Sequence, residues 1–136
     1  MAREIAHRLG WQYSDTDDEV VRKAGKPISR IFAEDGEEVF RMHESRALRV
    51  ACRQSRQVIA TGGGAVILAE NRELMKENGL VVCLEASSKV LFQRLTSGAE
   101  FGGQVVRPLL TGSEPLEKIN ALKKARADFY GIADIT

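Results

Sequence analysis

Apolar and polar positions along the chain alternate between helix-like segments and short apolar runs. Apolar residues three or four positions apart, such as Ile5 and Leu9, are typical of amphipathic helices. Helices are predicted at residues 1–9, 17–24, 28–33, 37–54, 70–78, 87–95 and 114–129. A short strand that runs into polar residues is predicted in "WQYSDTD" (11–17), and further strands are predicted in "QVIAT" (57–61), "LVVCLEA" (80–86) and "IADIT" (132–136). This alternation predicts an α/β domain with a mostly parallel sheet.

Two glycine-rich stretches interrupt this pattern. In "VIATGGGAVI" at 58–67, three glycines directly follow an apolar run, which indicates a sharp turn or a close approach to the backbone. The stretch at 96–112 is long, irregular and glycine-rich. Loops this long in compact domains are usually functional lids or disordered, so we interpret 96–112 as a lid-like loop, with disorder as the alternative.

Composition narrows the class of protein. The 136 residues fit one domain, and hydrophobic and charged fractions of 43% and 29% are typical of globular proteins. A net charge of +1 gives no reason to expect nucleic acid or a membrane surface as partner. Cys52 and Cys83 are predicted to be reduced thiols, and no apolar stretch reaches membrane-spanning length. We therefore expect a cytoplasmic protein.

Polar residues gather after the predicted strands, where α/β sheets bind ligands. Asp15 and Asp17 follow the first strand and Gly62 to Gly64 the second. Taken alone, the two aspartates could simply cap the next helix. Arg41 and Glu44, three residues apart on a helix, could form an ordinary surface ion pair.

Arg107 in the lid and Arg126 in the last helix complete the set of candidate residues, and each alone could be solvated surface. Together, arginines, aspartates and a glycine turn favour a small anionic substrate that carries several hydroxyls. Arginine binds carboxylate through paired hydrogen bonds, and aspartate accepts hydrogen bonds from hydroxyls.

The order and spacing of several motifs resemble the shikimate kinases over essentially the whole chain. These motifs are "DTD" (15–17), "IFAEDGEEVFRMHE" (31–44), "ATGGGAV" (60–66), "VVRPLL" (105–110) and "KKARADFYGIADI" (123–135). The resemblance implies a three-layer α/β/α fold of the nucleoside-monophosphate-kinase-like P-loop class, with a central parallel sheet. It also implies transfer of the ATP γ-phosphate to the 3-hydroxyl of shikimate, in aromatic amino acid biosynthesis, with Mg²⁺ and by a monomer.

The resemblance assigns roles to residues at matching positions. Asp17 would hold the substrate hydroxyls and help to activate the attacking oxygen, and Asp15 would support Mg²⁺ through water. Arg41 and Arg126 would bind the shikimate carboxylate, with Glu44 orienting Arg41.

The remaining roles concern the glycines and the nucleotide side. Gly62, Gly63 and Gly64 would lie against the substrate ring, the N–H of Gly63 reaching a hydroxyl. Arg107 would close over the transferring phosphate, and Arg94 would lie beside the adenine.

One family motif is not found in residues 1–136. The phosphate-binding sequence GxxxxGK[ST] would precede the helix that starts this chain, and "AGKP" at 24–27 lacks both the first glycine and the Ser or Thr. We therefore expect a single incomplete domain without the first strand, the P-loop and the C-terminal helix. Such a chain is expected to be unstable or partly ordered, and a poor kinase alone.

Two other functions fit the same residues. One is a module that binds shikimate without phosphorylating it, which ATP binding would distinguish. The other is a related small-molecule kinase, such as one acting on gluconate, although "TGGGAV" with "RPLL" favours shikimate.

Overall fold

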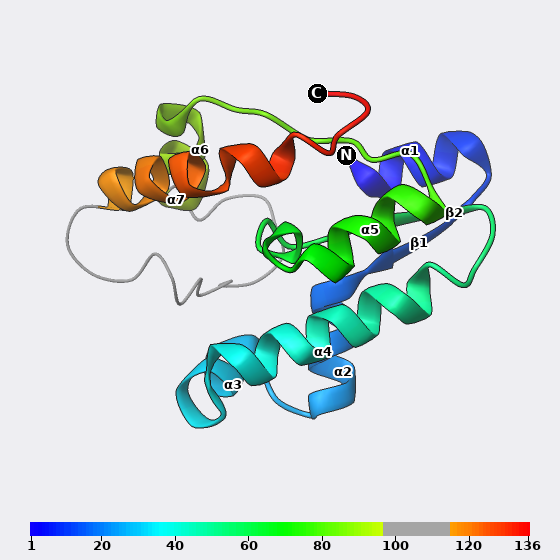
Figure 1. Cartoon of the computed structure of the whole chain (residues 1–136), viewed down its shortest axis with the longest axis horizontal. Helices are drawn as coiled ribbons and strands as arrows, with labels where there is room; N and C mark the ends of the chain where they lie inside the picture. The colour runs from blue at the N-terminus through cyan, green and yellow to red at the C-terminus, as the bar shows by residue number, and fades with distance from the viewer. Residues whose placement is uncertain (97–114) are drawn as a thin grey trace. The chain divides into compact units, whose positions relative to one another are not determined.

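The computed structural model describes residues 1–96 and 115–136, which divide into two compact units, Met1–Gly79 and Leu80–Thr136. The elements of the first unit (Figure 1) are α1 (Ala2–Leu9), β1 (Gln12–Asp15), α2 (Thr16–Ala24), α3 (Ile28–Glu34), α4 (Gly36–Ala51), β2 (Gln57–Ala60), the 3-10 turn η1 (Ala65–Ile67) and α5 (Ala69–Asn78). The second unit contains α6 (Ser88–Thr96) and α7 (Pro115–Tyr130). The helices lie within a few residues of their predicted bounds.

The sheet of the first unit pairs β1 with β2 in parallel. Gln12 lies opposite Gln57 and Asp15 opposite Ala60, so both strands end at the same edge. Helix α1 packs against both strands. The parallel pairing and the alternation of helix and strand confirm the predicted α/β class.

The apolar core of the first unit is built by α2, α3 and α4. Val20, Ile31 and Phe40 are buried there, one from each helix. The Phe40 ring packs against Phe32 with ring centroids 4.7 Å apart. This core fixes α4, the helix that carries Arg41 and Glu44.

Local signals explain where α1 and α2 end and where α2 begins. Gly10 and Gly25 follow the two helices in left-handed backbone conformations, with φ of 64° and 67°, which side chains other than glycine rarely adopt. Asp15 caps α2, since its carboxylate accepts a hydrogen bond from the Asp17 N–H at 2.9 Å. The capping role considered from sequence is therefore confirmed for Asp15.

The second unit differs from the sequence prediction at 80–86 and 132–136. Instead of two strands, these segments form one isolated parallel bridge between Val82 and Ile135. The Cys83 N–H donates to the Ile135 carbonyl at 2.8 Å, but the Val81 N–H is taken by the Asp134 carboxylate at 2.8 Å. An apolar run becomes a strand only when neighbouring strands pair with it, and here the pairing ends after one bridge.

A serine caps the first helix of the second unit. Ser87 precedes α6, and its Oγ accepts a hydrogen bond from the Val90 N–H at 3.3 Å, which is an N-cap contact. Residues 97–112 of the predicted lid, with Arg107, lie outside the described residues. The prediction of a single domain with a lid stays a prediction. No helix in the described ranges is long and apolar enough to cross a membrane.

Candidate substrate site

Arg41 and Glu44 form a buried ion pair on α4. Their side chains meet at 2.8 Å between Nη1 and Oε2, and the two residues are 8% and 0% exposed. Glu37 adds a second carboxylate, 3.1 Å from Nη2 and 3.3 Å from Nε of Arg41. The simple surface ion pair considered from sequence is wrong here, because the pair is enclosed.

The surroundings keep the Arg41 guanidinium charged. Burial lowers the pKa of Arg41, but the hydrogen bonds and charges of Glu44 and Glu37 outweigh that effect and leave the pKa above its ordinary value. The guanidinium also lies over the Phe40 ring, 5.2 Å from its centroid. Glu37 was missed from sequence, although its position four residues before Arg41 places both on one helix face.

The three glycines follow β2 and approach this pair. A Cβ atom built on Gly64 would lie 2.6 Å from Nη2 and 2.7 Å from Cζ of Arg41. One built on Gly62 would lie 3.2 Å from Oε1 of Glu44 and 3.3 Å from Oδ1 of Asp17. The turn therefore brings together Asp17 from α2 and the ion pair from α4.

The turn has a distinct inside and outside. Gly64 is buried, Gly62 is half-buried and Gly63 is exposed. Hydrogen bonds from the Ala65 N–H to the Gly62 carbonyl (3.1 Å) and from the Ile67 N–H to the Gly64 carbonyl (3.0 Å) hold the turn closed. Of the glycines, Gly63 is the one most open to a ligand.

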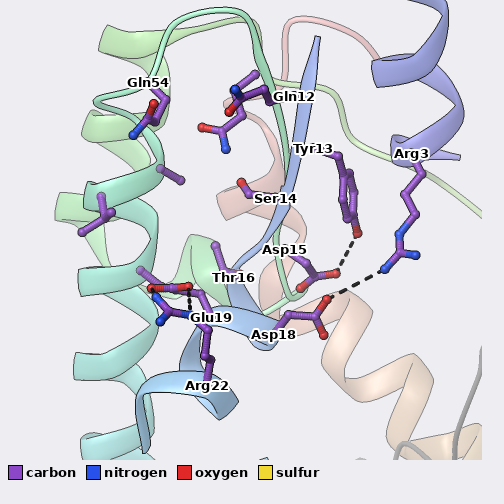
Figure 2. A pocket seen from close by; sticks show the side chains of 14 residues that line it. Arg3, Gln12, Tyr13, Ser14, Asp15, Thr16, Asp18, Glu19, Arg22 and Gln54 are labelled. Carbon is purple, nitrogen blue, oxygen red and sulfur yellow. Dashed lines mark hydrogen bonds and ion pairs between the residues drawn. The ribbon is translucent and has the colours of Figure 1, made fainter.

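Asp15 is close to Asp17 in the chain but has different contacts (Figure 2). Besides capping α2, it accepts a hydrogen bond from the Tyr13 hydroxyl at 3.0 Å. The Arg3 guanidinium lies 4.9 Å from the centre of the Tyr13 ring and 3.9 Å from the Asp18 carboxylate. Asp15 lines an open pocket of about 480 Å³, to which Asp17 and Arg41 do not contribute.

We place the candidate substrate site at Asp17 and Arg41 rather than in that pocket. Buried charges held in fixed positions are a stronger sign of ligand chemistry than an open polar groove. Arg126 and Arg94 belong to the second unit, where Arg126 is half-buried on α7 and Arg94 is exposed on α6. The structure thus brings together Asp17, Arg41, Glu44, Gly62 and Gly64 within the first unit.

Comparison with known proteins identifies relatives over nearly the whole chain. The family model for shikimate kinase matches residues 1–136. The shikimate kinase of Symbiobacterium thermophilum is 43% identical over 133 residues, which cover 98% of this chain and 74% of that protein. The shikimate kinase of Geobacter sulfurreducens is 44% identical over 131 residues, covering 96% of this chain and 69% of that protein.

Solved structures give the same result for the fold. A shikimate kinase from Acinetobacter baumannii in complex with shikimate matches with a TM-score of 0.91 and 36% identity, over 99% of this chain and 73% of that chain. The shikimate kinase from Aquifex aeolicus matches with a TM-score of 0.78 and 30% identity, over 98% and 75% of the two chains. The P-loop kinase-like α/β fold follows from these matches, and the chain belongs to the shikimate kinase family.

Proposed function

We propose that the protein transfers the γ-phosphate of ATP to the 3-hydroxyl of shikimate, and that residues 1–79 carry the shikimate side of the site. One observation supports this most directly: the buried Arg41–Glu44 pair lies against the glycine turn, next to Asp17. A guanidinium and a carboxylate held side by side suit a substrate with one carboxylate and several hydroxyls. Membership of the shikimate kinase family agrees with this chemistry.

Arg41 would bind the shikimate carboxylate. Its contacts with Glu44 and Glu37 hold the guanidinium plane, so little side-chain freedom is lost when substrate binds. Arginine is protonated in proteins, and the raised pKa of Arg41 favours this charged form further. We propose Arg126 as the second cation for the same carboxylate.

Asp17 would accept hydrogen bonds from the substrate hydroxyls and take the proton of the attacking oxygen. It stands in the first turn of α2, beside Gly62. The exposed Gly63 would donate its N–H to another hydroxyl. These contacts would fix the attacking oxygen in line with the phosphate, which is the main requirement of phosphoryl transfer.

Asp15 is suited to support Mg²⁺ through water rather than to enclose it. Its oxygens accept from Tyr13 and Asp17, and each carboxylate oxygen still has a lone pair for a metal-bound water. The described residues contain no group of three or more His, Cys, Asp or Glu side chains placed to hold a metal. Magnesium usually takes one or two carboxylates plus phosphate oxygens, and when bound it neutralises phosphate charge.

The nucleotide side is proposed from the family alone. ATP is the co-substrate that the family implies, with Arg107 over the transferring phosphate and Arg94 beside the adenine. Residues 1–136 contain no GxxxxGK[ST] sequence, so we assign no residue of this chain to the phosphate-binding loop. We further propose that the enzyme works as a monomer in the cytoplasm.

The test combines binding and turnover in the chain and its Asp17→Asn variant. Isothermal titration with shikimate and a phosphoryl-transfer assay with Mg-ATP are run side by side. Asp18→Asn is the matched control, because Asp18 is the neighbouring carboxylate and its side chain is exposed. We expect shikimate to bind to the chain and to the control, and more weakly to Asp17→Asn.

Turnover that disappears in Asp17→Asn but persists in Asp18→Asn would support the complete proposal. Binding without turnover would support the acceptor site and count against phosphoryl transfer by residues 1–136 alone. A chain that is folded but does not bind shikimate would overturn the proposed function.

A further inference from the structure

Gly62 and Gly64 differ in what a side chain at each position would meet. At Gly64 a Cβ atom would overlap the Arg41 guanidinium, with Cζ at 2.7 Å. At Gly62 it would touch Asp17 and Glu44 at 3.3 Å and 3.2 Å, which is tight but not overlapping. Gly64 is therefore the position where the absence of a side chain makes room for another residue.

The Arg41 guanidinium has little freedom to move away from such a side chain. Glu44 holds Nη1 at 2.8 Å, Glu37 holds Nε and Nη2, and the Phe40 ring lies over Cζ at 5.2 Å. The backbone of Gly64 closes a further side. A methyl group at residue 64 could be accommodated only if the guanidinium moved and gave up at least part of these contacts.

We propose that Gly64 is a positioning residue, which sets the place of the Arg41 guanidinium rather than contacting the substrate itself. Gly62 has the same relation, less tightly, to Asp17 and Glu44, whereas Gly63 is the exposed glycine of the three. This inference rests on the proposed function, since there Arg41 binds the carboxylate of the substrate. The family resemblance places all three glycines against the substrate ring and gives a separate contact only to the Gly63 N–H, so the positioning role of Gly64 is an addition to it.

Shikimate binding should depend on Gly64 because this residue sets the position of the Arg41 guanidinium plane. Paired hydrogen bonds between arginine and carboxylate need the guanidinium plane at one position and tilt. Gly64→Ala is expected to weaken shikimate binding by about ten- to a hundredfold, the range for losing a charge-assisted hydrogen bond. Gly79→Ala is the matched control, because a Cβ there meets nothing within 4 Å and the φ of 178° suits any residue.

A double-mutant cycle on the chain separates positioning from direct contact. Its members are the parent, Gly64→Ala, Arg41→Met and the double variant. Arg41→Met keeps an apolar stem on Phe40 but lacks the Cζ and Nη atoms that approach Gly64. Each chain is titrated with shikimate and, separately, unfolded in urea without ligand.

We expect Gly64→Ala to weaken binding about as much as Arg41→Met, and the double variant to bind no more weakly than Arg41→Met alone. In urea, the methyl group should lower stability in the parent and not in the Arg41→Met background. Equal effects of Gly64→Ala with and without the arginine, in both measurements, would overturn the inference.

The two proposals fail in distinguishable ways. If the parent does not bind shikimate, the proposed function fails and the ligand-free urea cycle alone decides whether Gly64 positions Arg41. If Gly64→Ala does not fold, the double variant decides. If the double variant folds, the overlap between the methyl group and the Arg41 guanidinium is supported. If the double variant also fails to fold, the positioning role of Gly64 is overturned.

Discussion

At the scale of single residues, Tyr13 of β1 makes the stability of the chain depend on alkaline pH. Burial raises its pKa above the ordinary value of 10.0, Arg3 opposes this rise, and the Asp15 carboxylate adds to it. The folded chain therefore keeps the Tyr13 proton at a pH where the unfolded chain has lost it. Stability from this group is complete below pH 10.0 and is lost as the pH rises through the raised pKa.

The free energy of unfolding should accordingly fall slightly above about pH 10. The fall is small because Tyr13 is only half-buried. Urea unfolding at a series of alkaline pH values measures it. Tyr13→Phe, which keeps the ring and removes the hydroxyl, should show a smaller fall than the parent. Identical curves for Tyr13→Phe and the parent would contradict the prediction.

The residue-level predictions from sequence were good where the contacts are local. The i, i+3 spacing of Arg41 and Glu44 correctly indicated that they meet. It could not show that the pair is buried, because residues that approach it closely, Gly62 and Gly64, lie about twenty residues further along the chain. The glycine stretch correctly indicated a close approach to the backbone. In this structure, side chains of the same unit approach Gly62 and Gly64.

At the scale of elements, helix α5 holds the turn that follows the glycines. The Asn71 amide donates to the Ala65 carbonyl at 2.9 Å and is 1% exposed. Arg72 donates to the carbonyls of Val66 and Ile67 at 2.7 Å and 2.8 Å. The first turn of α5 thereby fixes η1, and with it the downstream end of the glycine turn.

Removing the Asn71 amide should destabilise the chain. Asn71→Ala leaves a buried carbonyl without this donor, which costs about 1–3 kcal/mol in the free energy of unfolding. Asn78→Ala is a close control on the same helix, because its amide donates to the Leu74 carbonyl at 2.8 Å but is exposed. That change should cost less than about 0.5 kcal/mol in the same urea measurement. Equal losses would show that the buried contact does not hold the turn.

Helices were more predictable than strands for a physical reason. A helix such as α2 satisfies its backbone hydrogen bonds within itself, and Asp15 and Gly25 mark its ends locally. The apolar run at 80–86 gives no information about which segment pairs with it. The length of a strand at 80–86 depends on how many of its residues pair with residues 132–136, and this pairing stops after one bridge.

At the scale of the whole molecule, burial is unequal between the two units. The first has the core of Val20, Ile31 and Phe40, each from a different helix. In the described part of the second, Ile119 is the one buried apolar side chain, while Leu80 is 68% exposed. Family membership was predictable from dispersed motifs, but this imbalance was not, because burial depends on which elements pack together.

The imbalance predicts that the second unit opens before the first. Local opening costs least where few apolar groups are buried. Hydrogen exchange followed by mass spectrometry should show residues 80–86 exchanging well before β1 and α4. Rising urea concentrations should expose α7 before the first unit unfolds. Such separate transitions would agree with the sequence-based expectation of a partly ordered chain.

Two variants locate the cause of the early opening. Ile119→Ala removes a buried apolar side chain of α7 and should speed exchange in α6 and α7. Ile135→Ala alters a half-exposed side chain and should have a much smaller effect. If instead both units exchange with one common opening free energy, and the chain melts in one sharp transition, their stabilities are coupled. Burial within each unit would then not be what limits the stability of this chain.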